Sequence, residues 1–396
     1  MTKTFGQLGL APELVKSLAG GGITEPFAIQ TLTIADALAG RDLCGKAKTG
    51  SGKTLAFGLP LLQRLHLADE RAKPGHPLGL ILVPTRELAN QVGTVLRPLA
   101  EVLGRRVTTV YGGVPMDRQV KALRRGVDIV VATPGRLIDL GDRGEVSVSA
   151  VRMLVIDEAD RMADMGFMPQ VEWVLRRVPE AHQTLLFSAT LDEDVKYLVN
   201  NYLTDPVRHE VASLAPTVDE MEHRWLAVHQ ADKVKVAAAI ARASFKTMIF
   251  VRTKRGADRL AGQLNKEGIR SSAIHGDLRQ SARERAMNEF GCGRLPVLVA
   301  TDVAARGLDI DAVDVVVHFD PPVDHKSYLH RSGRTARAGE SGVVATLVLW
   351  DQRADVEKIQ RRLGLVAPIV EVFSNDPRLG ELAKWKPERT AKHAAA

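Results

Sequence analysis

The chain has 396 residues, of which 45% are hydrophobic and 26% are charged, and this composition is ordinary for a folded soluble protein. Its length exceeds what one hydrophobic core usually organises, so two domains are expected. The net charge of +7 and the pI near 9.4 are compatible with a polyanionic partner without establishing one, and the four tryptophans and four tyrosines argue against recognition by broad aromatic platforms.

The cysteines and the apolar runs bear on the compartment. Cys44 and Cys292 lie far apart and lack the spacing of metal ligands, so both are expected to be small buried side chains in a reducing compartment. The N-terminus lacks the apolar core of a signal peptide, and runs such as 78–83 and 313–317 are too short to cross a bilayer. A cytoplasmic protein is therefore expected.

Short apolar runs alternate with amphipathic helical stretches in both halves of the chain. Strands are predicted at 80–83, 129–131, 153–156, 184–187, 247–251, 297–300, 313–319 and 343–349. Strands that alternate with helices indicate a parallel sheet in each half. A segment with two prolines and no clear period separates the two sets. The predicted organisation is a domain at 1–207, a linker at 208–219, a domain at 220–374, and a short, weakly ordered basic tail at 375–396.

A phosphate loop is predicted where a glycine-rich run opens a helix expected at 55–65. The run comprises Ala47, Lys48, Thr49, Gly50, Ser51, Gly52, Lys53 and Thr54. The two glycines let backbone N–H groups curl around a phosphate, Lys53 can reach the β- and γ-phosphates, and the Thr54 hydroxyl can ligate Mg²⁺. Ala47 stands where the usual pattern has its first glycine. The alternative is a glycine-rich turn that binds no nucleotide.

Two adjacent carboxylates, Asp157 and Glu158, end the buried strand predicted at 153–156. In open α/β sheets ligands lie at the carboxyl ends of strands, so Asp157 is predicted to hold Mg²⁺ directly or through water. Glu158 is predicted to orient and deprotonate the attacking water. The alternative is that both acids merely favour the dipole of the following helix. The upstream phosphate loop favours the nucleotide site.

Further motifs follow one another along the chain, at residues 22–30, 84–89, 112–113, 133–136, 188–190, 249–254, 280–283, 300–309 and 330–337. Together with the phosphate loop and the acids, they make the chain resemble the DEAD-box RNA helicases. The similarity extends from about residue 5 to about residue 349. It implies two tandem RecA-like α/β domains, each a parallel sheet flanked by helices, with ATP and Mg²⁺ as cofactors and RNA as the partner.

The resemblance assigns the adenine contacts to two residues. Gln30 would read the adenine edge, because an amide offers a donor and an acceptor together, and Phe5 would stack on the ring. Ile23 and the pair 27–28 depart from the family pattern without touching the glutamine. The alternative readings are that Gln30 is a structural cap and that Phe5 belongs to the core.

The resemblance also implies residues that grip the RNA backbone without reading its sequence. They are Thr85, Arg86, Gly113, Thr133 and Arg136 in the first half, and Gln280, Arg283 and Thr301 in the second, with weaker support for Gly276 and Asp277. Hydroxyls, helix N-terminal amides and close glycine backbones suit phosphate oxygens and ribose. Gln280 and Arg283 are three apart and would share a helix face. Arg86 could instead serve as a structural salt-bridge partner.

Ser188 and Thr190 end a predicted strand and can hydrogen-bond Asp160. By resemblance this link couples the nucleotide state to RNA separation, whereas the alternative is that both hydroxyls are helix caps.

Three closely spaced arginines, Arg331, Arg334 and Arg337, lie in the motif at residues 330–337. Arg334 and Arg337 are three apart and would project from one helical face, and arginines this close repel one another unless an anion is near. The resemblance makes these two the fingers that reach the γ-phosphate. It also places His330 near the catalytic acids and Asp309 on the ATP ribose.

The predicted function is an RNA-dependent ATPase that locally unwinds short RNA duplexes or remodels RNA–protein complexes, with hydrolysis coupled to closure of the two domains on RNA. One alternative is an ATP-gated RNA clamp or assembly factor with little unwinding. Another is a DNA-directed superfamily-2 helicase, against which the Gln30 motif and Asp160 count. Protein partners would belong to ribosome assembly or RNA decay, and the sequence does not name the RNA.

Overall fold

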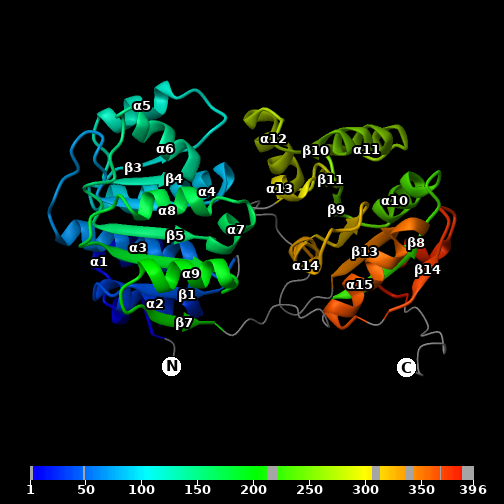
Figure 1. Cartoon of the computed structure of the whole chain (residues 1–396), viewed down its shortest axis with the longest axis horizontal. Coiled ribbons are helices and arrows are strands. Elements are labelled where there is room, and N and C mark those ends of the chain that lie inside the picture. Colours follow the sequence, from blue (N-terminus) through cyan, green and yellow to red (C-terminus); the bar gives the residue numbers. More distant parts are fainter. Residues whose placement is uncertain are drawn as a thin grey trace. The chain divides into compact units, whose positions relative to one another are not determined.

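The computed structural model describes residues 3–47, 50–211, 221–305, 313–335, 342–365 and 367–385 (Figure 1). The chain divides into two compact units, Met1–Ser213 and Leu214–Ala396. Each unit contains a seven-stranded sheet in which all recorded strand pairs are parallel. The predicted α/β fold with a parallel sheet in each half is therefore confirmed.

The first unit has the strand order β3-β4-β2-β5-β6-β1-β7. The strands are β1 (Leu43–Lys46), β2 (Gly79–Leu82), β3 (Val107–Val110), β4 (Ile129–Ala132), β5 (Met153–Asp157), β6 (Gln183–Ser188) and β7 (Val207–Glu210). The helices are α1 (Pro12–Gly20), α2 (Ala28–Leu38), α3 (Lys53–Leu67), α4 (Arg86–Val102), α5 (Asp117–Arg124), α6 (Pro134–Asp142), α7 (Ala159–Asp164), α8 (Met168–Leu175) and α9 (Glu193–Tyr202).

Both faces of this sheet are buried, which explains why its central strands are almost continuously apolar. Ile81 and Val155 belong to one hydrophobic core, which also contains residues of α1 to α4. Leu80 and Leu154, their neighbours along the same strands, belong to the other core with residues of α6 to α9. Successive side chains of a strand point to opposite faces, so one strand contributes to both cores.

The second unit repeats this plan with the order β10-β11-β9-β12-β13-β8-β14. Its strands are β8 (Glu222–Ala227), β9 (Thr247–Phe250), β10 (Ser271–Ile274), β11 (Val297–Ala300), β12 (Val315–His318), β13 (Val343–Val348) and β14 (Ile369–Glu371). Its α-helices are α10 (Lys233–Arg242), α11 (Lys254–Lys266), α12 (Gln280–Gly291), α13 (Asp302–Ala305), α14 (His325–Ser332) and α15 (Arg353–Leu363). Ile249 and Met248, adjacent on β9, again belong to two different cores.

The strands that the sequence predicts are all present, with ends shifted by at most two residues. The strands it does not predict are β1, β3, β7, β8, β10 and β14. Of these, β3, β7, β10 and β14 are the edge strands of the two sheets, and β1 and β8 lie next to an edge strand. Edge strands bury only part of their surface and need no continuous apolar run, as the half-buried Val-Arg-His-Glu of β7 illustrates.

Two predicted boundaries need correction. Residues 208–210, assigned to the linker, belong to β7 and pair with β1, while 212–219 lie outside the described residues. The predicted tail is ordered at its start, because Leu379 and Leu382 are buried and Arg224 Nε donates to the Leu382 carbonyl oxygen at 3.0 Å. This part packs on the second unit as far as residue 385.

The prediction for the cysteines is half wrong. Cys44 is buried in β1, but Cys292 is exposed just after α12, where helix ends meet solvent. Hydrogen bonds from the Arg294 backbone N–H and from its side chain, whose Nε donates to Cys292 Sγ at 3.0 Å, lower the pKa of the thiol. Separately, no helix within the described ranges is long and apolar enough to cross a membrane.

Candidate active site

The carboxyl edge of the first sheet gathers most of the predicted site residues of that unit. Leu82, at the end of β2, lies level with the last residue of β4 and with Ile156 of β5. Lys46, at the end of β1, lies level with Ser188 at the end of β6. Because neighbouring parallel strands end together, the segments that follow them meet at one edge, where ligands of such sheets bind.

Asp157 is the last residue of β5 and is only 2% exposed. The Glu158 backbone N–H donates to Asp157 Oδ1 at 3.0 Å. Burial raises the pKa of Asp157 to about 7, and the positive charge of Lys53 opposes that shift. A buried carboxylate is costly without compensating charge, so this position favours a cation nearby.

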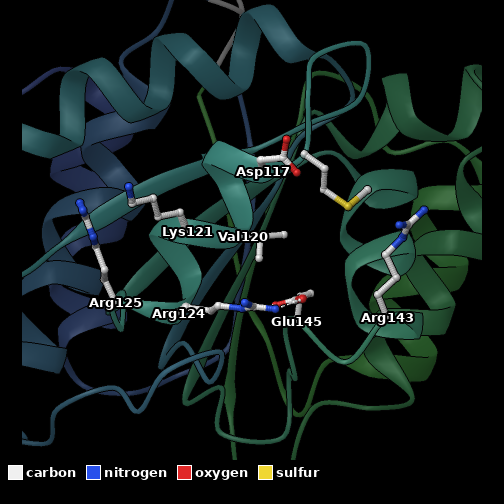
Figure 2. Close-up of a pocket in the computed structure, with 8 residues that line it drawn as sticks. Asp117, Val120, Lys121, Arg124, Arg125, Arg143 and Glu145 are labelled. Carbon is white, nitrogen blue, oxygen red and sulfur yellow. Dashed lines mark hydrogen bonds and ion pairs between the residues drawn. The ribbon is translucent and has the colours of Figure 1, made fainter.

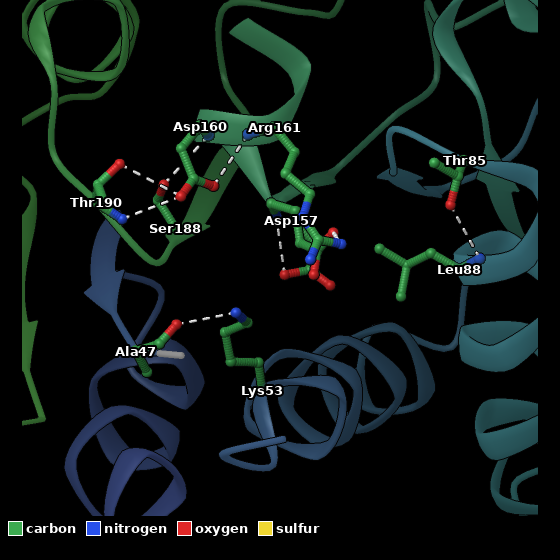
Figure 3. A network of polar contacts seen from close by, with 10 residues as sticks. Ala47, Lys53, Thr85, Leu88, Asp157, Asp160, Arg161, Ser188 and Thr190 are labelled. Carbon is green, nitrogen blue, oxygen red and sulfur yellow. Dashed lines mark hydrogen bonds and ion pairs between the residues drawn. The ribbon is translucent and has the colours of Figure 1, made fainter. Parts of the chain in front are cut away.

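The phosphate loop joins β1 to α3. Gly50 and Gly52 have φ of 82° and 86°, a left-handed conformation that glycine adopts without strain. Lys53 is the first residue of α3, is buried, and donates from Nζ to the Ala47 carbonyl oxygen at 2.9 Å (Figure 3). Its ammonium group thus lies against the loop that would cradle the phosphates. Ser51 and Thr54 lie half-buried beside it, and Lys48 and Thr49 are outside the described residues.

The predicted Mg²⁺ ligands fit that ion. The described residues contain no cluster of three or more His, Cys, Asp or Glu side chains that could hold a metal by itself. Mg²⁺ however takes oxygen ligands and commonly needs only one or two carboxylates, because water and substrate phosphates complete its shell. The buried Asp157 carboxylate and the Thr54 hydroxyl supply oxygen donors of this kind.

Glu158 precedes α7 and has a left-handed backbone with φ of 55°, which is uncommon for a residue with a side chain. Its Oε2 accepts a hydrogen bond from Arg161 Nη1 at 2.6 Å, and both side chains are buried. Arg161 is not among the site residues predicted from the sequence. The available signal was its spacing of three from Glu158 at the start of a helix.

Asp160 connects the acids to the end of β6 (Figure 3). Its backbone N–H donates to Ser188 Oγ at 3.2 Å, and its Oδ2 accepts from the backbone N–H and the hydroxyl of Thr190 at 3.1 and 3.3 Å. The predicted hydrogen bonds between these hydroxyls and Asp160 are thus confirmed, since β5 and β6 are neighbours. The coupling role remains a prediction.

Gln30 is buried between α2 and the phosphate loop. Its Oε1 accepts from the Phe27 N–H at 2.8 Å, which caps α2, and its Nε2 donates to the Gly52 carbonyl oxygen at 2.9 Å. Gln30 is therefore a structural cap of α2, which was the alternative to an adenine contact. A carboxamide has two N–H groups and two lone pairs, so one of each is still available for adenine.

Phe5 lies in the hydrophobic core of the first unit and is 2% exposed. The structure therefore favours the core reading, since a ring that stacks on adenine needs an open face. Phe27, in contrast, is 58% exposed and lies so close to Gly52 that a Cβ there would approach its ring to 2.6 Å.

The residues predicted to grip RNA in the first unit follow β2, β3 and β4, which are neighbours in the sheet. Thr85 caps α4 by accepting from the Leu88 N–H at 3.3 Å, so its hydroxyl hydrogen is available to another acceptor. Arg86 lies over Gly113, whose φ of 80° would strain any residue with a side chain, and a Cβ there would displace the Arg86 guanidinium. Among the described residues, the salt-bridge reading of Arg86 is supported by one long contact of 3.9 Å to Glu87.

Thr133 and Arg136 begin α6, immediately after β4. Arg136 Nη1 donates to Gln119 Oε1 at 3.3 Å and both Nη atoms contact the Val114 carbonyl oxygen. These contacts tie the start of α6 to the segment that follows Gly113. The residues of the first unit that are predicted to hold RNA therefore follow β3, β4 and β2, along one half of the carboxyl edge of the sheet. The acids and the phosphate loop follow β5 and β1, along the other half.

In the second unit, the corresponding residues follow β10 and β11. Gln280 and Arg283 occupy the first turn of α12, as predicted, with Arg283 only 6% exposed. Thr301 directly follows β11 and is 7% exposed. Lys254 Nζ is paired with Asp277 Oδ1 at 2.6 Å and approaches Gly276.

The arginine run begins at the end of α14. Arg331 is buried, and its Nε and Nη2 donate to the two carboxylate oxygens of Asp302 at 2.6 and 2.8 Å. Arg331 therefore has a structural ion pair within the second unit, which was not predicted from the sequence. Arg334 follows, half-buried, and its backbone oxygen accepts from the Val313 N–H at 3.1 Å. His330 lies on α14. Arg337 and Asp309 lie outside the described residues.

A hollow of about 550 Å³ is lined in part by residues of α5 (Figure 2). Its charged lining consists of Lys121, Arg124, Arg125, Arg143, Asp117 and Glu145. Arg124 and Glu145 close one side with contacts of 2.9 and 2.5 Å. None of the predicted nucleotide ligands lines this hollow, so it is not the predicted nucleotide site.

The matching family models, the similar proteins and the similar solved structures agree with one another. Residues 27–198 match the DEAD/DEAH box helicase family, and residues 232–339 match the helicase conserved C-terminal domain. The chain is 40% identical over 360 residues to the DEAD-box ATP-dependent RNA helicase CshA of Bacillus cereus (strain ATCC 10987 / NRS 248), covering 90% of this chain and 68% of the relative. It is also 40% identical over 370 residues to DEAD-box ATP-dependent RNA helicase 9 of Oryza sativa subsp. japonica, covering 90% and 57%. Among solved structures, S. cerevisiae Dbp5 bound to RNA and ADP BeF3 is similar with a TM-score of 0.80 and 31% identity, over 97% of this chain and 99% of that one.

Proposed function

The chain belongs to the DEAD-box family of ATP-dependent RNA helicases, and from this premise we propose that it is an RNA-dependent ATPase that opens short RNA duplexes locally or remodels RNA–protein complexes. The observation that carries the proposal is the division of one sheet edge. The ends of β5, β6 and β1 carry the acids and the phosphate loop, while the ends of β3, β4 and β2 carry residues suited to phosphate and ribose. A strand of RNA and a nucleotide would then bind side by side on the same rigid scaffold.

Hydrolysis is proposed to use residues of both units. Lys53 and the loop amides would hold the β- and γ-phosphates, and Glu158 would orient the attacking water and accept its proton. When bound through Asp157 and Thr54, Mg²⁺ would supply positive charge to the phosphates. Arg334 and Arg337 would come from the second unit to the γ-phosphate, with His330 near the acids and Asp309 on the ribose. Phosphoryl transfer leaves little covalent chemistry to the protein, so positioning and charge are its main contributions.

Activation by RNA follows from this division of labour. Neither unit holds the complete set of residues, so binding of ATP and RNA by both would bring the units together and switch hydrolysis on. Thr85, Arg86, Gly113, Thr133, Arg136, Gln280, Arg283 and Thr301 are proposed to hold the RNA backbone without sequence preference. Asp160, Ser188 and Thr190 are proposed to transmit the nucleotide state to that grip. The bend imposed on one strand would release its complement.

The proposal is tested by measuring ATP turnover with single-stranded RNA, with single-stranded DNA of the same sequence, and with no polymer. We expect turnover to rise strongly with RNA and little with DNA, because the 2′-hydroxyl distinguishes the two backbones. The same rate in all three mixtures would contradict the proposal, and equal stimulation by DNA would favour a DNA-directed helicase.

Unwinding and clamping are separated by a duplex-release assay with a short labelled duplex. Release of the labelled strand that requires ATP supports local unwinding. RNA binding that ATP strengthens without any strand release would instead favour the clamp.

Glu158→Gln tests the proposed base. The amide keeps the size of the side chain but cannot accept the proton of water, so hydrolysis should fall while ATP and RNA still bind. We expect a long-lived complex with RNA in the presence of ATP, measured as a slow dissociation of labelled RNA. Rapid RNA release from this variant, at the rate of the unchanged protein, would contradict the assignment.

A further inference from the structure

Glu158 and Arg161 form a buried ion pair at the start of α7. Arg161 Nη1 and Glu158 Oε2 are 2.6 Å apart, and the two side chains are only 7% and 5% exposed. The residues are three apart, with Arg161 in the first turn of α7 and Glu158 just before it. The pair therefore directly involves the carboxylate that is proposed to act on water.

Arg161 also contacts the neighbouring acid. Its backbone N–H donates to Asp160 Oδ1 at 3.0 Å, while Asp160 Oδ2 accepts from Thr190. One residue is thus bound to Glu158 through its guanidinium and to Asp160 through its main chain. Through Arg161, Glu158 is linked to Asp160, and Asp160 is hydrogen-bonded to Ser188 and Thr190 at the end of β6.

A purely stabilising role does not account well for this pair. Removing two charges from water is expensive, and a buried ion pair often adds no more stability than apolar side chains of the same size would. Arg176, directly after α8, has a similar contact of 2.5 Å to Glu172, but its side chain is 65% exposed, so the cost of removing its charge from water is much smaller. A buried pair on a proposed catalytic residue is better explained by the orientation that it imposes.

Orientation matters at Glu158 because a glutamate side chain has several rotatable bonds. Its left-handed backbone places the side chain where α7 begins, and the planar guanidinium then restrains the carboxylate. A misplacement of about 1 Å at a reacting group can cost roughly 10²-fold in rate.

We propose that Arg161 is a positioning residue for hydrolysis, which holds the Glu158 carboxylate in the orientation from which it accepts the proton of the attacking water. The inference rests on the proposed function and extends it to a residue outside the predicted site. It requires that Arg161 act through Glu158 rather than on ATP or RNA directly.

The test is a double-mutant cycle of Arg161→Ala and Glu158→Gln in the full chain. Alone, Arg161→Ala should lower the kcat of RNA-stimulated ATP turnover about 10- to 100-fold. The KM for ATP and the RNA concentration that gives half-maximal stimulation should stay unchanged. Added to Glu158→Gln, it should produce no further loss, because the group that it positions is already disabled.

Two further variants separate positioning from folding. Arg161→Lys keeps a cation near the carboxylate and should recover part of the lost kcat, while thermal unfolding reports any loss of structure. Arg176→Ala removes an exposed arginine that directly follows α8 and should leave kcat unchanged.

Three outcomes would overturn the proposal: a full additional loss in the Glu158→Gln background, a rise in the KM for ATP as large as the fall in kcat, or faster turnover without RNA. The last of these would mean that Arg161 restrains hydrolysis instead of supporting it. If the unchanged protein shows no stimulation by RNA, the proposed function itself fails, and the role of Arg161 fails with it. These results are distinguishable because the unchanged protein is measured first.

Discussion

Lys53→Ala is expected to abolish measurable ATP-dependent activity, with kcat falling on the order of 10²- to 10³-fold or more. Lys53 is buried at the start of α3, and its ammonium group lies 2.9 Å from the Ala47 carbonyl oxygen within the phosphate loop. The measurement is phosphate release at saturating RNA, together with binding of a fluorescent ATP analogue.

The control is Lys121→Ala, which removes an exposed lysine of the same unit from α5 and should leave turnover unchanged. Thermal unfolding of both variants should show that the first unit is still folded. Normal turnover in Lys53→Ala would refute the assignment of the phosphate loop, and with it the nucleotide site.

Arg334→Ala is expected to reduce RNA-stimulated kcat by roughly 10³- to 10⁵-fold while changing RNA affinity little. An arginine finger stabilises charge that develops on the transferred phosphate, so its loss raises the barrier more than it weakens binding. The backbone of Arg334 is held to Val313, which gives the side chain a fixed starting point. Turnover at saturating RNA is compared with RNA binding measured by fluorescence anisotropy.

Arg353→Ala is the matched control, because it removes an exposed arginine of α15 in the same unit, paired with Glu357. Arg331 would be unsuitable, since its loss leaves Asp302 without a buried partner and threatens the fold. If Arg334→Ala weakens RNA binding as much as it slows turnover, the residue contacts RNA rather than the γ-phosphate.

The strands and the chemistry of the site were accessible from sequence for a shared reason. The central strands are buried on both faces, so each is an unbroken apolar run, and each ends in a short polar motif such as Asp157-Glu158 or Ser188 to Thr190. Both signals are local and need no knowledge of neighbouring strands. Edge strands such as β7 escaped prediction because one side of their backbone needs no partner and their side chains alternate between half-buried and exposed.

The arginines show where local signals end. Arg331 and Arg334 stand three apart in one motif, yet Arg331 is committed to Asp302, whose place beside α14 depends on the order of β11, β9 and β12. The spacing of the arginines alone does not reveal which of them forms an ion pair with a carboxylate of its own unit. Phe5 is a similar case, because an aromatic residue near the N-terminus reads equally well as a stacking platform or as core.

By itself, the sequence determined the two α/β units and the helicase motif set, and it predicted the phosphate loop and the pair of catalytic acids, because each of these signals lies in a short stretch of consecutive residues. Only the tertiary structure decided which polar groups meet: Asp160 with Ser188 and Thr190, Gln30 with Gly52, and Arg331 with Asp302. Those contacts join segments up to 30 residues apart in the sequence. The contacts of Asp160 form because β5 and β6 are neighbouring parallel strands, whose ends meet at one edge of the first sheet.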